Sequence, residues 1–278
     1  MFSGCTFEGT IDLAPGSGAG GTGGAAGSGG RGGSGGSGTG GAGGVGGVGG
    51  GGAGGAGGAP MSDAGASDSG AGSDAATDGS AEPTAGDLLA RLRSCTPVSA
   101  GRYSTDVGTP ANIPICQLVG AVFWQADMDI DCDGRVSAQC NASTDPAFMP
   151  QTSATESNGQ YLDAATLPYV VVPLPSSRFD YSTAGIQFGT VIAVLYSNRV
   201  EYGVFGDEGP AEIIGEASYA MAQRLGIDPN PSTGGVDSGV SYIVFTGPSG
   251  VAAPIEDHNQ AVRVGQMRAL QFLQDNPP

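Results

Sequence analysis

Residues 16–58 limit where this chain can fold, because the segment contains little more than Gly, Ala, Ser and Thr. Of the 53 glycines in the chain, 34 precede residue 86. Such residues have almost no side-chain surface to bury, so the segment cannot offset the entropy lost on ordering. Residues 61–82 are acidic and rich in Ser, and they show no hydrophobic period. We therefore expect a disordered N-terminal tether over residues 1–85 and one folded domain over residues 86–278.

The charge of the chain is strongly one-sided. The net charge is −17 at pH 7, and all ten basic residues are Arg. A surface of this sign repels nucleic acid and anionic lipid and attracts polycations, although it can also serve solubility alone. We expect no nucleic-acid partner. The sequence contains no apolar run of 18 residues, so we expect no membrane-spanning segment either.

Four of the five cysteines, Cys95, Cys116, Cys132 and Cys140, fall inside the expected domain. They form no CxxC pair, and the chain has a single histidine, His258, so a zinc site is not expected. Two disulfides in an exported protein fit these cysteines better. Of the three connectivities, we favour Cys132–Cys140 together with Cys95–Cys116.

The N-terminus lacks the apolar region of a complete export signal. The segment Phe2-Ser-Gly-Cys5 nevertheless resembles the end of a bacterial lipoprotein cleavage site, and the Gly-rich tether follows it. We expect an extracellular or surface-anchored protein in which Cys5 is a candidate for lipidation. The signal itself would lie upstream of Met1 or have been removed. The alternative is an N-terminal cysteine without a role.

Short segments rich in β-branched and aromatic residues predict strands, because Gly, Pro, Asn and Ser separate them. These segments are residues 119–124, 169–172, 190–196, 201–205 and 240–245. Apolar residues at helical spacing predict two helices, over residues 213–225 and 257–274. The fold class is therefore mainly β with two helices, arranged as a barrel or a sandwich.

Four aspartates recur at every second position, at Asp127, Asp129, Asp131 and Asp133. On an extended segment all four would project from one face, where their repulsion calls for a cation nearby. Residues 129, 131, 133 and 134 match positions 1, 3, 5 and 6 of a calcium loop, but Cys140 stands where that loop needs Glu. The alternatives are a subsite for ammonium groups and a solvated strand edge. We favour the subsite, with Asp127, Asp129 and Asp131 binding substrate, and expect no metal or cofactor.

Two further carboxylates, Asp207 and Glu216, flank a short Gly/Pro turn. This placement suits a proton donor and a proton acceptor that act on one bond. The structural alternative is a helix that starts near Gly215, because its dipole would favour Glu216 in the first turn. A single histidine disfavours Ser-His-Asp and Cys-His chemistry, and no GK[ST] closes the Gly-rich tract into a phosphate loop. Two carboxylates acting on a glycosidic bond remain as the favoured chemistry.

Six segments, in order over about residues 114–246, carry a family resemblance. They are FWQADMDIDCDG at 123–134, DP at 145–146, LPYVVVP at 167–173, GDEGP at 206–210, IGEASY at 214–219 and GVSYIVF at 239–245. Together they resemble glycoside hydrolase family 75, the endo-chitosanases first known from fungi. The interval between Asp207 and Glu216 is shorter than in fungal members, which leaves the loop contacts open. The tether and the helix after Pro254 lie outside the resemblance.

The resemblance implies a secreted, inverting endo-hydrolase of chitosan, a β-1,4 polymer of glucosamine. It implies Asp207 and Glu216 as the essential pair and a β-barrel related to the double-psi type. We expect Glu216 to act as the acid and Asp207 as the base. The alternative pairs one of them with an aspartate of the 127–131 segment. The expected partner is chitosan or a partly acetylated glucosamine polymer, and the protein is expected to be a monomer.

Trp124 and Tyr219 are candidates for stacking on sugar rings, and the alternative places both in the core. Two rival functions remain open. One is a lectin-like surface module whose acidic groove binds aminosugar polymers without cleaving them. The other is an adhesion module stabilised by Ca²⁺.

Overall fold

The computed structural model describes residues 82–278. The predicted tether, residues 1–85, lies outside this part except for its last four residues, and so does Cys5. The tether, the boundary after residue 85 and the role of Cys5 therefore stay predictions.

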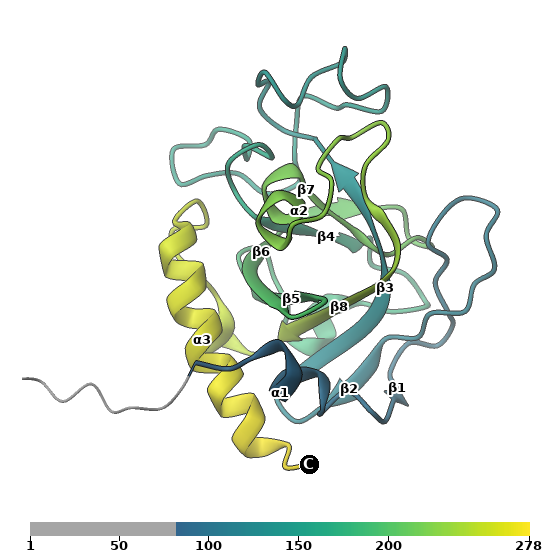
Figure 1. The fold of residues 1–278 in the computed structure, drawn as a ribbon, viewed down its shortest axis with the longest axis vertical. Coiled ribbons are helices and arrows are strands. Elements are labelled where there is room, and N and C mark those ends of the chain that lie inside the picture. Colours follow the sequence, from purple (N-terminus) through teal and green to yellow (C-terminus); the bar gives the residue numbers. More distant parts are fainter. Residues whose placement is uncertain (1–81) are drawn as a thin grey trace, which may run out of the picture. The chain divides into compact units, whose positions relative to one another are not determined.

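Six strands close into a barrel (Figure 1). In spatial order they are β3 (Ala121–Asp131), β7 (Glu216–Ser218), β4 (Tyr169–Pro173), β6 (Arg199–Gly209), β5 (Val191–Tyr196) and β8 (Val236–Phe245), and β8 pairs back with β3. Two short strands, β1 (Thr96–Pro97) and β2 (Cys116–Leu118), extend the sheet from β3. The pairs β3–β7 and β4–β6 are parallel. The predicted mainly-β barrel is confirmed, and its double-psi type stays a prediction.

Three α-helices accompany the barrel: α1 (Ala85–Leu89), α2 (Tyr219–Leu225) and α3 (His258–Asp275). The short 3₁₀ turns η1 (Tyr181–Ala184) and η2 (Pro248–Gly250) lie in the connections. Helix α3 runs along one side of the barrel near β5 and β6 (Figure 1). The sequence predicted α3 to within one residue at each end, whereas α1 was not predicted.

The predicted helix over residues 213–225 is wrong in its first half. Residues 216–218 form strand β7, and helix α2 begins only after Ser218, whose Oγ accepts a hydrogen bond of 3.2 Å from the backbone N–H of Met221. The helix ends at Gly226, as predicted, in the left-handed conformation at φ 76°. Glu216 therefore lies on a strand, and a helix dipole does not explain its position.

Alternate residues of the strands pack into two apolar clusters, as the period of a strand requires. Trp124 and Met128 of β3 share the barrel interior with Tyr242 of β8, and helix α2 adds Met221. The residues between them face outward. Under helix α3, the outward-facing side chains form a second cluster that includes Ile243, Phe245, Ala193, Leu195, Val264 and Phe272. The outer face of β3, β7, β4 and β6 carries polar groups instead at one end of these strands.

Two disulfides, Cys95–Cys116 and Cys132–Cys140, link the described cysteines. The predicted pairing is confirmed. The second disulfide begins directly after β3 ends and constrains residues 132–140, which continue from the aspartate array. Within residues 82–278, no helix combines the length and the apolar character needed to cross a bilayer.

Candidate active site

A cleft of about 720 Å³ opens on the outer face of the barrel, and we call it the acidic cleft. Seven carboxylates line it: Asp129, Asp131, Asp133, Asp145, Asp207, Glu208 and Glu216. The remaining lining is apolar or small, with Met149, Val171, Leu174 and Pro210 among it. Among the described residues that line this cleft, none is basic and none is aromatic. Its interior is therefore strongly acidic, and burial together with mutual repulsion raises the pKa of several of these carboxyl groups.

Strand pairing brings Glu216 next to the aspartate array. In the parallel β3–β7 pair, Asp129 stands opposite Glu216 and Asp131 opposite Ser218. The backbone N–H of Asp129 donates to the carbonyl of Gly215 at 2.8 Å, which fixes this register. Residues 129 and 131 share one face of β3, as predicted, and that face is the floor of the acidic cleft.

A β-bulge aims Asp207 into the same cleft. The register of the β4–β6 pair advances from Val170–Phe205 to Val171–Asp207, which leaves Gly206 without a partner. Phe205 points into the barrel, so regular alternation would turn residue 207 inward as well, and the extra residue turns it outward. Gly206 is required here, because a Cβ atom would lie 2.7 Å from both Leu162 Cδ1 and Tyr169 Cβ.

Val171 of β4 lies between the two predicted catalytic residues. It stands opposite Asp207 on one side, and the pairing of Val170 with Ala217 places it next to Glu216 on the other. The backbones of Asp207 and Glu216 are thus two strand spacings apart, about 10 Å. Both carboxylates line the acidic cleft, so they face a common space from opposite sides of Val171.

Burial and neighbouring negative charge favour the protonated form of Glu216. Burial raises its pKa to about 7, and the charges of Asp129, Asp133 and Asp207 add to the effect. None of the hydrogen bonds found among residues 82–278 reaches the Glu216 carboxylate. Nothing in this part of the chain therefore offsets the cost of its charge, and Glu216 can hold a proton near neutral pH.

Asp207 has a different environment, although it is only 7% exposed. Its Oδ1 accepts hydrogen bonds of 2.8 Å from the backbone N–H groups of Ser153 and Glu208. Burial raises the pKa of Asp207, while these bonds act in the opposite direction because they stabilise the charged form. The two carboxyl groups thus differ: backbone donors partly offset the effect of burial on Asp207, and none of the hydrogen bonds found among residues 82–278 does so for Glu216.

Asp127, predicted to bind substrate, does not line the acidic cleft. It is 5% exposed, and its Oδ1 atom is buried without a hydrogen-bond partner. The carboxylate lies against Gly215, where a Cβ atom would come within 2.0 Å of Oδ1. Burial raises the pKa of Asp127 to about 7, with further contributions from Asp129, Asp106 and Glu216. Asp127 lies beside the site as a buried acid and offers no surface to a polymer.

The two predicted stacking residues also lie elsewhere. Trp124 is 2% exposed and stacks on Tyr242 inside the barrel, with ring centroids 5.3 Å apart. Successive side chains of a strand face opposite sides of the sheet, so the even-numbered Trp124 cannot share a face with the odd-numbered Asp129 and Asp131. Tyr219 begins helix α2 and lines a separate depression beside Pro229, outside the acidic cleft. The alternative that placed Trp124 in the core is the correct one.

Three carboxylates could present oxygens to a cation. One oxygen each of Asp131, Asp133 and Asp207 lies within 4.8 Å of the others. Backbone N–H groups already donate to all three carboxylates. Those of Asp133 and Met149 donate to Asp131 Oδ1 at 2.7 Å and to Asp133 Oδ1 at 2.6 Å, and Asp207 Oδ1 accepts the two bonds described above. The calcium loop, an alternative that the sequence left open, has a different composition: its first ligand would be Asp129, which lies within strand β3.

No sequence pattern pointed to a role for several residues of the cleft. Asp145 belongs to the DP segment and Glu208 to the GDEGP segment, but neither residue type in that position indicates a catalytic or binding role. The donor to Asp207, Ser153, comes from a loop 54 positions earlier and acts through its backbone, which no side-chain pattern reveals. Only the three-dimensional structure shows that these residues lie at the cleft.

The part of the chain that forms the acidic cleft also matches known proteins. Residues 128–271 match the family described as fungal chitosanase of glycosyl hydrolase group 75, so the match extends through most of helix α3. Endo-chitosanase C of Aspergillus oryzae is 34% identical over 137 residues, which cover 48% of this chain and 33% of that protein. Endo-chitosanase B of the same species is 32% identical over 148 residues, which cover 48% and 62%. The matched part thus spans between a third and about six-tenths of these relatives.

Among solved structures, Streptomyces papain inhibitor (SPI) is similar over 48% of this chain and 99% of its own, with 17% identity and a TM-score of 0.27. A likeness at that score supports no conclusion about this fold. The match to the family covers more than half of the chain and includes the acidic cleft with Asp207 and Glu216. This chain belongs to glycoside hydrolase family 75.

Proposed function

We propose that this protein hydrolyses internal β-1,4 bonds of chitosan with inversion at the anomeric carbon. The observation that carries the proposal is the pair Asp207 and Glu216, which face one anionic cleft from different electrostatic environments. Membership of the family and the names of the endo-chitosanase relatives support the choice of substrate.

Glu216 is the general acid of this mechanism. Its carboxyl group is protonated near neutral pH and donates that proton to the leaving glycosidic oxygen. Asp207 is the general base, because two backbone donors stabilise its charged form, which can take a proton from water. An inverting pair needs about 6.5–9.5 Å between its carboxyl groups to admit that water. Two strand spacings of about 10 Å between the backbones are compatible with such a gap.

The remaining carboxylates explain a preference for aminosugars. Chitosan carries ammonium groups below the pKa of its amines. Burial raises the pKa of both aspartates on the cleft floor, Asp129 and Asp131, and an ammonium group beside them would favour their charged forms. Because none of the described lining residues is aromatic, ring stacking contributes little to binding in this cleft. Charge pairing is then the main source of affinity.

The two disulfides bear on where the reaction takes place. Two disulfides form and persist in oxidising compartments, so we place the enzyme outside the cell. Lipidation of Cys5 and the tether over residues 1–85 would hold such a domain at the surface. We further propose that the domain acts as a monomer, since a single chain supplies every carboxylate of the acidic cleft.

A chitosan digest tests the proposal. Incubation of the full chain with chitosan should release reducing ends and lower the viscosity early, as internal cleavage requires. Proton NMR of the first products should show the α-anomer before mutarotation, because inversion of a β-bond gives that anomer. Binding to chitosan without any release of reducing ends would instead support the lectin-like module. The β-anomer as first product would overturn inversion.

A further inference from the structure

The loop of residues 152–163 supplies the backbone donor of Asp207, and we call it the Ser153 loop. The N–H of Ser153 donates to Asp207 Oδ1 at 2.8 Å. Next to it, the N–H of Ala154 donates to the carbonyl of Gly206 at 3.1 Å, beside the bulge. The Ser153 loop contains no strand of the barrel, so other contacts must fix its position.

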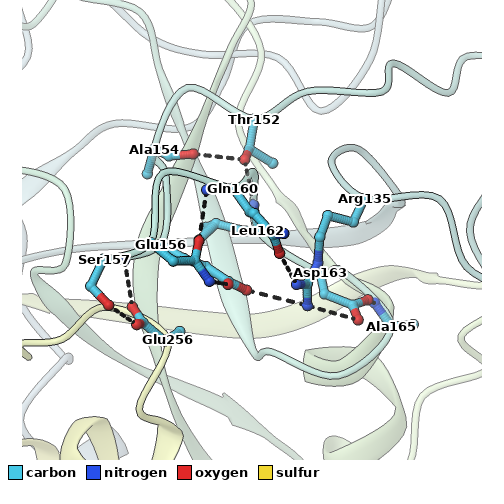
Figure 2. Close-up of polar contacts among 11 residues, drawn as sticks. Arg135, Thr152, Ala154, Glu156, Ser157, Gln160, Leu162, Asp163, Ala165 and Glu256 are labelled. Atoms are coloured by element: carbon cyan, nitrogen blue, oxygen red, sulfur yellow. Dashed lines mark hydrogen bonds and ion pairs between the residues drawn. The ribbon is translucent and has the colours of Figure 1, made fainter.

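The Thr152 hydroxyl links the two ends of the loop, since it accepts from the N–H of Leu162 at 3.0 Å and donates to the carbonyl of Ala154 at 2.8 Å. Arg135 adds side-chain contacts at the base of the loop (Figure 2). Its guanidinium donates to Gln160 Oε1 at 2.8 Å, and Nη2 lies 3.3 Å from a carboxylate oxygen of Glu156 and 3.4 Å from one of Asp163. Its backbone N–H also donates to the carbonyl of Leu162 at 2.8 Å. One side chain thus holds three residues of the Ser153 loop.

The electrostatics favour this clamp. The side chain of Glu156 is only 9% exposed, and that of Arg135 is 39% exposed. Glu156 and Asp163 are both anions that share one cationic partner, so without it they would repel each other in a poorly solvated place. Lys would not be equivalent, because it lacks the planar fork that reaches three acceptors at once.

A second anchor holds the tip of the loop independently. Both the hydroxyl and the backbone N–H of Ser157 donate to the carboxylate of Glu256, which precedes helix α3 (Figure 2). Loss of the Arg135 contacts should therefore displace the loop near Ser153 while its tip stays attached. The domain should still fold, because neither the barrel interior nor the disulfides depend on Arg135.

We infer that Arg135 is a positioning residue for the proposed reaction: its guanidinium fixes the Ser153 loop so that the Ser153 N–H reaches the base, Asp207. The inference rests on the proposed function for its catalytic meaning. Its physical content is independent, because a missing donor changes the titration of Asp207 whether or not the protein turns over chitosan.

The test compares Arg135→Gln and Arg135→Lys with Arg263→Gln as matched control. Arg263 pairs with Asp257 at 3.6 Å on the exposed side of α3, with side chains 61% and 38% exposed. The titration of Asp207 is followed by carboxyl ¹³C NMR, with the signal assigned by its loss in Asp207→Asn. In parallel, kcat and KM on chitosan are measured against pH.

Arg135→Gln should raise the pKa of Asp207 and move the acid limb of the pH profile to higher pH. It should lower kcat by about tenfold with little change in KM, since base geometry and not substrate binding is altered. Arg135→Lys should give a smaller change of the same sign, which also tests the inference if the Gln variant fails to fold. Arg263→Gln should match the wild type.

The inference is overturned if the Arg135 variants lose thermal stability while the Asp207 titration and the pH profile stay as in the wild type. That result would mean a purely structural ion pair. If even the wild type releases no product from chitosan, the proposed function fails. The NMR titration then still decides whether Arg135 positions the donor of Asp207.

Discussion

Asp207 and Glu216 face the same cleft from the two sides of Val171, with their backbones two strands apart. This relationship depends on two separate devices, the parallel β3–β7 pair and the bulge at Gly206. The two carboxylates therefore have different hydrogen-bond partners and different burial. Both have negative neighbours, but two backbone N–H groups donate to Asp207 and none of the hydrogen bonds found among residues 82–278 reaches the Glu216 carboxylate. Two carboxyl groups that differ in this way can take opposite roles.

Removing either carboxylate should abolish turnover. Asp207→Asn and Glu216→Gln keep the shape of the side chains and remove their proton chemistry. We expect each to lower kcat on chitosan by about 10²–10⁴-fold, the usual contribution of a general acid or base. Glu212→Gln, at an exposed acid of the intervening loop, is the charge-matched control and should retain activity. Near-full activity of either site variant would remove that residue from the mechanism.

The basic limb of the pH profile should respond to Asp129. The negative charge of Asp129, directly opposite Glu216, is the largest contribution after burial to the raised pKa of Glu216. Asp129→Asn removes that repulsion, so the pKa of Glu216 falls and less of it is protonated at neutral pH. The basic limb of kcat/KM should therefore move to lower pH. A limb that stays in place or moves upward would argue against Glu216 as the acid.

Local pattern identified the parts of the barrel that carry long apolar runs. Strands β4 and β5 were predicted almost to the residue, because Val and Ile dominate them. Strands β1, β2 and β7 have two or three residues each, which is too short for any period to show. Residues 213–218 fitted a helical spacing, and only their pairing with β3, far away in sequence, turns them into a strand.

For the site as well, local sequence pattern predicted the residues but not their long-range contacts. The carboxylates of the aspartate array and the pair Asp207 and Glu216 could be found from residue types and order. The environment of each could not, because it depends on contacts between distant segments. Asp127 and Asp129 look equivalent in sequence, yet one is buried against Gly215 and the other lines the cleft. The burial of each side chain determines which of the two aspartates can reach substrate, and sequence spacing does not report burial.

Asp127 should make stability depend on pH. Its pKa is about 7 in the folded protein against an ordinary 3.8, so the folded state binds more protons than the unfolded state between these values. The free energy of unfolding must then fall as pH rises through this window. Asp127→Asn removes that loss and should raise Tm by several degrees at pH 8 but not at pH 4. Asp275→Asn, at an exposed acid of α3, should change neither value. An equal effect of Asp127→Asn at both pH values would contradict this account.

The bulge at Gly206 should tolerate no side chain. A Cβ atom there would lie 2.7 Å from Leu162 and from Tyr169, both of which are fully buried. Gly206→Ala should therefore lower Tm sharply, with about 1–3 kcal/mol of destabilisation from overpacking, and should displace Asp207. Gly86→Ala in helix α1 is the matched control, because its Cβ would meet only Thr84 Oγ1 at 3.8 Å. Thermal denaturation that ranks the two variants equally would refute the bulge as the feature that positions Asp207.

Binding in the acidic cleft should weaken with salt. Raising the ionic strength from about 0.01 M to about 0.15 M shortens the screening length from about 30 Å to about 8 Å. Because the described lining residues supply carboxylates and no aromatic ring, most of the attraction for a glucosamine oligomer is charge pairing. The inactive Glu216→Gln variant should therefore bind a glucosamine hexamer several-fold more weakly at the higher salt, measured by titration calorimetry. Asp131→Asn in that background should lower both the affinity and its salt dependence. The fully acetylated hexamer is the uncharged control, and its binding should be weak at both salt concentrations. Tight, salt-independent binding of the acetylated oligomer would show that the cleft recognises the sugar rings and not their ammonium groups.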